Sequence, residues 1–203
     1  MKTLKKIFII IEIIIFISFI VMDLNNIDSS YLKYLGIILC FIYNLINKNI
    51  IFLVASIFTI ISDYFLLLTN NHIIIGLITF IIVQFTYMYY LHTKKINNHY
   101  LLRAIIYILI FIITLIIKTN IETLLALLYF STLVINTICS YQNNNLFIYS
   151  LGLTLFIGCD INVGLHNIMS VGTIYELATL FMWIFYLPSQ VLITLGGNKD
   201  VES

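Results

Sequence analysis

Two aspartates lie inside long apolar stretches of the chain, where a charged side chain is rarely tolerated. Asp63 stands in IIFLVASIFTIISDYFLLLT, residues 50–69, which contain no other charged residue. Asp160 stands in LFIYSLGLTLFIGCDINVGLHNI, residues 146–168. An aspartate at the centre of a bilayer costs about 2.5–3.5 kcal/mol on insertion scales. An acid kept at such a position therefore predicts a functional role.

Two carboxyl groups that converge in a dry pocket divide into one protonated and one ionised group, which together provide a general acid and a general base. Asp63 and Asp160 stand at similar distances from the starts of their stretches, and both stretches are predicted to cross the membrane in the same direction. The two acids are therefore expected at one depth, in its outer half. Two alternatives stay open for such a pair: a structural hydrogen bond, and a proton- or cation-coupled transport site.

The composition of the chain requires a membrane setting for these acids. Hydrophobic residues make up 62% of the sequence and charged residues 9%, whereas a soluble domain carries about 25% charged residues. Too little polar surface is present to cover a soluble protein, so lipid is the predicted solvent. The net charge of +1, without a basic stretch that contains interleaved aromatics, argues against a nucleic-acid partner. Cysteine and histidine spacing predicts no disulfide, metal or cofactor.

Apolar stretches of about 20 residues have the length of a membrane-spanning helix. The polar breaks between them are too short for a soluble domain, so the sequence predicts a single integral-membrane helical domain over residues 1–203. The basic start followed by an apolar run resembles a signal peptide, but no A-x-A-like cleavage site follows, and we interpret it as a retained first helix. Eight spans are predicted, the second of them short: 6–23, 31–46, 50–69, 73–92, 100–118, 121–141, 146–168 and 174–195.

The distribution of lysine and arginine predicts the orientation of this all-α polytopic bundle. With both termini in the cytoplasm, eight basic residues lie on the inner side and two on the outer side, as the positive-inside rule favours. The prediction is a multi-pass protein of the cell membrane. The inner residues are Lys2, Lys5, Lys6, Lys48, Lys94, Lys95, Arg103 and Lys199, and the outer ones are Lys33 and Lys118.

Polar residues within the spans recur at helical spacing and form stripes that should face inward, because polar groups in contact with lipid are costly. One stripe leads to Asp63 through Ser56 and Thr59. In the last span Pro188 lacks an N–H and is expected to kink the helix. The polar side chains around it are suited to hold a ligand or water. The alternative for uncharged members of these stripes is that they only join helices.

Four segments of the chain together resemble the YhhN-like family of integral membrane proteins. They are SDYFLLL, GLITFIIVQFTYMYY (76–90), LGLTLFIGCDINVGL (151–165) and WIFYLPSQVLITLG (183–196), and the resemblance extends from about residue 30 to 196. Each segment is short and apolar, so the set in its order and spacing carries the resemblance.

The family pattern also matches individual polar positions. Two departures are visible: Tyr34 follows the matched lysine where many members have proline, and Gln84, which has no titratable group, stands where many have histidine. The matches are the two intramembrane aspartates Asp63 and Asp160, the lysine Lys33 near the start of the second helix, the tyrosine Tyr129 of the sixth helix, and Tyr186 and Gln190 in a YxxxQ-like segment.

The resemblance implies lysoplasmalogenase activity, in which the vinyl ether of a lysophospholipid is cleaved to a fatty aldehyde and a glycerophospho-ethanolamine or -choline. Asp63 and Asp160 would serve as general acid and base, and Lys33 would meet the phosphate. Membrane lipid would surround the bundle, which would receive the alkenyl chain. Two alternatives remain: a small-molecule or ion-coupled transporter, and a structural or regulatory membrane protein. The residues expected to position substrate or water are Gln84, Tyr129, Asn162, Tyr186 and Gln190.

Overall fold

The computed structural model describes residues 2–69, 72–169 and 171–198, and these residues form helices joined by short turns, with no strand among them. The eight predicted spans correspond to eight α-helices, with ends that differ by a few residues. The helices are α1 (Lys2–Leu24), α2 (Ser30–Ile46), α3 (Ile50–Asp63), α4 (Ile73–Thr93), α5 (Tyr100–Ile117), α6 (Ile121–Ser140), α7 (Phe147–Ile168) and α8 (Thr173–Gly197). A π-helical turn, Tyr64–Leu68, follows α3, and a 3₁₀ turn, Asn144–Leu146, precedes α7.

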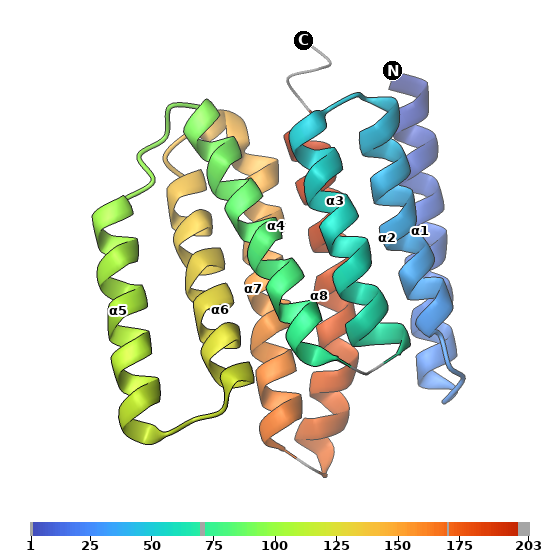
Figure 1. The fold of residues 1–203 in the computed structure, drawn as a ribbon. Helices are drawn as coiled ribbons and strands as arrows, with labels where there is room; N and C mark the ends of the chain where they lie inside the picture. The colour runs from blue at the N-terminus through green and yellow to red at the C-terminus, as the bar shows by residue number, and fades with distance from the viewer. Residues whose placement is uncertain (1, 70–71, 170, 199–203) are drawn as a thin grey trace.

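Six of the helices form a closed ring, in the order α2, α3, α4, α6, α7 and α8, with α8 returning to α2. The remaining two lie outside the ring at opposite edges, as Figure 1 shows: α1 packs on α2 and α8, and α5 packs mainly on α6. Only Arg103 and Thr114 of α5 are buried. The interior of the ring is therefore the place where polar side chains from several helices can meet.

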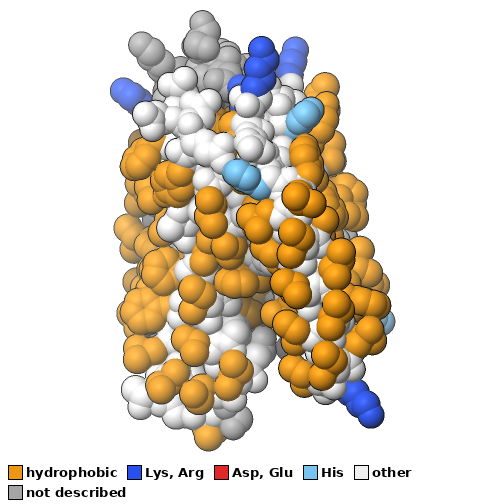
Figure 2. Space-filling model, turned by 90° about the vertical axis from the view of Figure 1, so that its left-hand side faces the viewer, with side chains coloured by type: hydrophobic (Ala, Val, Ile, Leu, Met, Phe, Trp, Pro, Cys, Tyr) orange, Lys and Arg blue, Asp and Glu red, His pale blue; other side chains and the backbone are white. Residues whose placement is uncertain are grey.

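The helices have the length and composition of membrane spans. Seven of them are apolar enough and long enough to cross a bilayer, and α2 is a shorter apolar helix of 17 residues that lies beside α1 and α3. Figure 2 shows hydrophobic side chains over most of the height of one face of the molecule. Lipid is the solvent that such a surface requires. The chain is a multi-pass helical membrane protein.

The first and last helices begin and end at the same end of the bundle, here called the termini end (Figure 1). In the view of Figure 2, basic side chains gather mainly at the termini end. The positive-inside rule predicts a cytoplasmic position for such an end, as the sequence predicts for both termini. Lys2 and Lys199 belong to the predicted inner set, but the side chain of Lys2 and all of Lys199 lie outside the described part of the chain.

The sequence predicted one continuous helical span over residues 50–69, but the structure divides it into two helical geometries. The α-helical pattern ends at Asp63, and the next five residues form the π-helical turn. Single π-helical turns occur frequently at functional sites of proteins. In α8 the helix continues through Pro188 from Thr173 to Gly197. Asp63 is thus at the junction between two helical geometries.

Close packing of α7 on α8 depends on glycines that leave no room for a side chain. A Cβ atom added to Gly196 would lie 2.7 Å from the Cα atom of Tyr149 on α7, while one added to Gly164 would meet nothing within 4 Å. Small residues allow such close approach between membrane helices.

We therefore expect Gly196→Ala to lower the free energy of unfolding by about 1–3 kcal/mol, the usual cost of overpacking. Gly164→Ala is the matched control, because it adds the same methyl group to a helix at an open position. Thermal unfolding of the purified variants measures the difference. Equal melting temperatures for the two variants would show that α7 and α8 can separate at no cost.

Candidate functional site

Asp63 on α3 is held by a tyrosine of α8, which is separated from α3 in the ring by α2. The hydroxyl of Tyr186 on α8 lies 2.8 Å from Oδ1 and 2.7 Å from Oδ2 of Asp63, and shares its hydrogen between them. The Asp63 side chain is 4% exposed. A buried carboxyl group with one shared donor has unused hydrogen-bonding capacity on both oxygens. It is fixed in orientation and free to engage a further group.

Asp160 on α7 forms a second acid–tyrosine pair with Tyr129 on α6. The hydroxyl of Tyr129 and the Asp160 carboxyl group interact electrostatically. Tyr129 Oη and Asp160 Oδ2 are both buried, and neither makes a hydrogen bond of normal geometry. Tyr129 and Asp160 are therefore neighbours whose interaction lacks the hydrogen-bond geometry that Tyr186 makes with Asp63.

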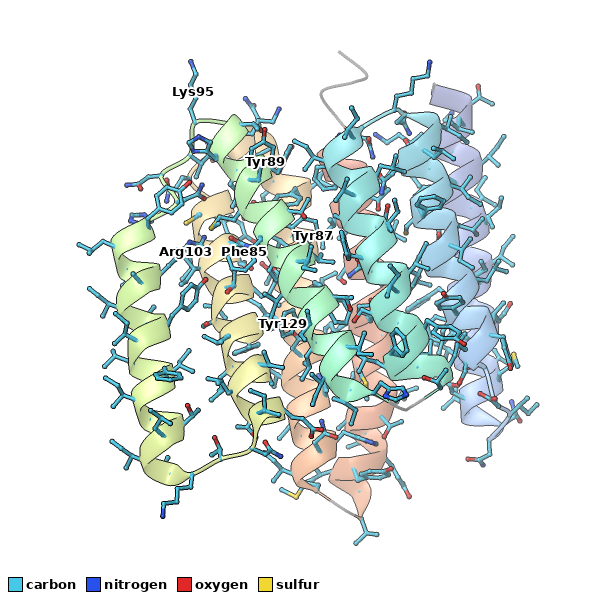
Figure 3. All side chains as sticks on the ribbon, viewed as in Figure 1. Phe85, Tyr87, Tyr89, Lys95, Arg103 and Tyr129 are labelled. Atoms are coloured by element: carbon cyan, nitrogen blue, oxygen red, sulfur yellow. The ribbon has the colours of Figure 1, made fainter. Side chains whose placement is uncertain are left out.

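The two pairs belong to one site. The ring of Phe156 on α7 packs against both tyrosines, with centroid distances of 6.3 Å to Tyr129 and 5.5 Å to Tyr186. The buried thiol of Cys159 interacts electrostatically with both aspartates. Tyr129 lies near the middle of the height of the bundle in Figure 3. The structure thus brings the predicted acids into one region, but through tyrosines and a thiol and not through a mutual hydrogen bond.

Lys33 already has an anionic partner, which the sequence analysis did not assign to it. Its Nζ lies 2.9 Å from Oδ2 and 3.1 Å from Oδ1 of Asp23 on α1. The ammonium group also stands 4.8 Å from the ring centroid of Trp183, and that ring meets Tyr186 edge-on at 5.4 Å. Lys33 is therefore separated from the Tyr186–Asp63 pair by one indole ring.

Gln84 lies in a different polar cluster, with Arg103 and Asn136. The Nδ2 of Asn136 donates to the Gln84 carbonyl and side-chain oxygens at 2.9 and 3.0 Å, and Arg103 Nη2 donates to Asn136 Oδ1 at 2.8 Å. Arg103 Nε donates to the Asn98 carbonyl at 2.8 Å. Figure 3 shows Arg103 reaching from α5 toward α6. Neither aspartate belongs to this cluster, which joins α4, α5 and α6.

The remaining predicted residues are Asn162, on the same helix as Asp160, and Gln190, on the same helix as Tyr186. Asn162, two residues beyond Asp160, is half-buried and donates to the carbonyl of Gly158 at 2.7 Å. Gln190 lies one turn beyond Tyr186, is buried, and its Nε2 has no hydrogen-bond partner. Gln190 thus has a free donor in the interior, whereas the amide of Asn162 is engaged with its own helix.

A wide hollow in the structure lies away from the aspartates. It has a volume of about 410 Å³, lies between α4, α5 and α6, and neither acid contributes to it. Tyr107 and Thr132, whose hydroxyl oxygens are 2.8 Å apart, contribute its polar atoms. Its other residues are apolar, and it faces the gap that the peripheral position of α5 leaves.

Comparison with models of protein families shows the family to which the chain belongs. The model of the YhhN family matches residues 29–197, which include α2 to α8 and all the polar positions described above except Asp23. The chain belongs to the YhhN family. No curated protein and no solved structure matches it in the same comparisons.

The first helix lies before the matched YhhN residues, yet it contributes acidic side chains near its middle and at its C-terminal end. Asp23 pairs with Lys33 near the α1–α2 turn. Nearer the middle of α1, Glu12 is 3% exposed, its Oε1 lies 3.8 Å from the thiol of Cys40, and its Oε2 has no partner. The YhhN segment of this chain is therefore completed by an α1 helix that adds two acids.

Proposed function

We propose that this YhhN-family protein is a membrane hydrolase that cleaves the vinyl ether bond of lysoplasmalogen. The observation that supports this best is a pair of carboxyl groups in the bundle interior. Asp63 is buried and bonded by Tyr186, and Asp160, half-buried with its Oδ2 enclosed, lies beside Tyr129. The resemblance to a family whose characterised members are lysoplasmalogenases supplies the substrate class. Family membership itself rests on the match over residues 29–197.

Hydrolysis of a vinyl ether needs an acid and a base at the same bond. Protonation of the outer alkene carbon gives an oxocarbenium ion, water adds to the carbon that bears oxygen, and a carboxylate removes a proton from that water. The hemiacetal then collapses to the aldehyde as a proton passes to the leaving glycerol oxygen. Two carboxyl groups serve glycosidases in the same way, although there the proton goes to oxygen. In this proposal Asp63 and Asp160 share the two roles.

The tyrosines orient the acids in this mechanism. Tyr186 bonds both oxygens of Asp63 and so fixes the plane of that carboxyl group. Tyr129 faces Asp160 without a closed hydrogen bond, so both groups remain available to substrate or water. Asn162 and Gln190 are proposed to position substrate or water beside them. Gln84 is assigned to the Arg103 cluster instead, because all its hydrogen-bond contacts among the described residues lie there.

Lys33 is proposed to bind the phosphate of the head group at the end of the bundle opposite the termini. Its charge is balanced by Asp23 in the absence of substrate, so a phosphate would share or replace that ion pair. We expect Lys33→Gln to raise KM several-fold and to change kcat little, since the interaction is the same in the ground state and the transition state.

Lys118→Gln is the matched control for this prediction, because Lys118 lies in the α5–α6 turn at the same end of the bundle. It removes the same charge from the membrane surface far from Trp183. Initial rates over a range of substrate concentrations separate KM from kcat. An unchanged KM in Lys33→Gln would contradict the head-group role.

The decisive experiment is aldehyde release by the purified protein in detergent from a defined lysoplasmenyl-ethanolamine. The matched control lipids are the 1-O-alkyl and 1-acyl analogues, which carry the same head group without a vinyl ether. We expect aldehyde from the vinyl ether lipid alone. Release of fatty acid from the acyl lipid would indicate an esterase, and no product from any of the three would remove the proposal.

The alternative is an ion-coupled carrier, whose site would also use buried acids between helices. It predicts flux of a solute into liposomes that contain the protein, without covalent change. An Asp63→Asn variant would then lose flux while no aldehyde is formed by the wild type.

A further inference from the structure

A small cavity lies inside the ring between α2, α3, α4 and α8, and neither aspartate lines it. The space available to the centre of a water molecule is about 10 Å³, close to the smallest cavity that holds one water. Seven of its ten lining residues carry polar side-chain atoms, which is unusual inside a bundle this apolar. The lining residues are Ile37, Cys40, Asn44, Phe52, Ser56, Thr59, Tyr87, Gln190, Ile193 and Thr194.

The lining offers what a single water molecule needs. Gln190 is 5% exposed and its Nε2 donor has no partner. The hydroxyls of Ser56 and Thr59 donate to carbonyls of their own helix, those of Leu53 and Ala55, both at 3.0 Å. Each hydroxyl oxygen therefore keeps its capacity to accept. A water that accepts from Gln190 and donates to the two hydroxyls would make about three hydrogen bonds, the usual number for buried water.

The position of the cavity links it to Asp63. Thr59 lies one turn before Asp63 on α3, and Gln190 lies one turn beyond Tyr186 on α8. Both steps lead from the acid–tyrosine pair toward the termini end. Tyr87, which also lines the cavity, interacts electrostatically with Asp63. The cavity is thus a polar space about one helical turn from Asp63, on the side of the bundle that carries the termini.

On its other side the cavity approaches a cluster of asparagines at the termini end. Asn44 lines the cavity and donates to the carbonyl of Phe52 at 3.3 Å. Its Oδ1 accepts from Nδ2 of Asn198 at 2.6 Å, and Oδ1 of Asn198 has no partner. Asn44 and Asn198 are both buried. Polar side chains therefore extend from the end of α8 through Asn44 to the cavity, which lies one helical turn from Asp63.

We propose that this cavity binds one ordered water molecule and is the last position through which water reaches Asp63 from the termini end. The second half rests on the proposed function, because each cleavage of a vinyl ether consumes one water. Water bound at Gln190 is one turn from the reacting groups and is replaced from the asparagine cluster after each turnover.

Radiolytic hydroxyl-radical footprinting of the purified protein tests the water site without any need for activity. Radicals formed from a bound water oxidise the side chains beside it, so Tyr87 should be oxidised although it is 2% exposed. Tyr43 is the internal control: it is 3% exposed, packs on Phe8 at 4.4 Å and does not line the cavity. We expect several-fold more oxidation at Tyr87 than at Tyr43, and equal low oxidation would overturn the proposal.

Ser56→Val fills the cavity and removes one acceptor, so Tyr87 oxidation should fall to the level of Tyr43. Thr137→Val is the matched control, because Thr137 is a buried hydroxyl that donates to a carbonyl one turn back, at 2.8 Å, and lies outside the cavity. Should Ser56→Val fail to fold, Thr59→Val removes a hydroxyl with little change of shape. Unchanged Tyr87 oxidation in a folded Ser56→Val or Thr59→Val variant would also overturn the water site.

The kinetic arm separates the water path from the proposed function. If the wild type releases aldehyde, Thr59→Val should lower kcat several-fold with KM unchanged, and Thr137→Val should leave both unchanged. Normal kcat in Thr59→Val, with footprinting as expected, would retain the water but remove its role in supply. A wild type that releases no aldehyde removes the proposed function, and the footprinting result then decides the water site alone.

Discussion

Asp63→Asn and Asp160→Asn are each expected to reduce aldehyde release by about 10²–10⁴-fold, the range that general acid–base catalysis contributes. Asparagine has nearly the shape of aspartate, and its carbonyl oxygen still accepts the hydrogen bond that Tyr186 donates at 2.7–2.8 Å to Asp63. It cannot give up or take a proton at the reacting carbon or at water. The initial rate with lysoplasmenyl-ethanolamine measures the loss, and an unchanged melting temperature shows that the fold is kept.

Two comparisons make this prediction specific. Glu122→Gln removes an acid from the first turn of α6, at the end of the bundle opposite the termini, and should leave the rate unchanged. The rate of aldehyde release by the double variant of Asp63 and Asp160 should be only a little lower than that of the less active single variant. The effects of residues that act as one unit are strongly non-additive. Full activity in either single variant would contradict the acid–base assignment, and additive losses would indicate that the two acids act separately.

Arg103→Leu is expected to be the most destabilising single change in the described part of the chain. It removes hydrogen bonds to the Asn98 carbonyl and to Asn136 Oδ1, both 2.8 Å long and both from a charged donor. Such bonds contribute about 1.5–3 kcal/mol each, and the abandoned acceptors stay buried. We therefore expect a loss of roughly 3 kcal/mol or more in the free energy of unfolding, measured by thermal or denaturant unfolding.

Local unfolding of the Arg103→Leu variant should begin at α5. This helix packs mainly on α6, and Arg103 is one of its two buried residues. Limited proteolysis should cut the α4–α5 turn of the variant well before that of the wild type. Arg103→Lys keeps the charge but not the planar fork, and should give an intermediate loss. Lys95→Leu, in the same turn, is the surface control. Since the Arg103 cluster includes neither aspartate, the folded fraction of Arg103→Lys should keep its kcat.

Most of the fold was predictable because the bilayer restricts what a chain can do. Backbone groups in hydrocarbon must be paired within the chain, so long apolar stretches become helices and polar breaks become turns. The eight predicted spans correspond to α1 to α8 within a few residues at each end. The acids Asp63 and Asp160 were identifiable for the same reason, because a carboxyl group is too costly in these stretches to be there by chance.

The partners of these residues were not predictable from the sequence. Isoleucine-rich helices such as α1 and α5 offer apolar side chains in nearly every direction, so periodicity leaves the rotation of each such helix about its axis weakly defined. Only the tertiary structure decides that Tyr186 faces Asp63, across 123 positions in the sequence. It equally decides that Asp23 pairs with Lys33.

Arg103 shows most clearly that the partners of a polar residue could not be predicted from the sequence. The sequence placed it with the cytoplasmic lysines as a charge that orients the chain, whereas in the structure it is 2% exposed and binds Asn136 of the neighbouring helix. Gln84, expected near the substrate, is bound to the same asparagine. The sequence by itself determined the solvent, the helices and the acids, since these follow from local hydrophobicity. The tertiary structure decided which polar groups meet, because that depends on helices that are distant in sequence and adjacent only after the ring has closed.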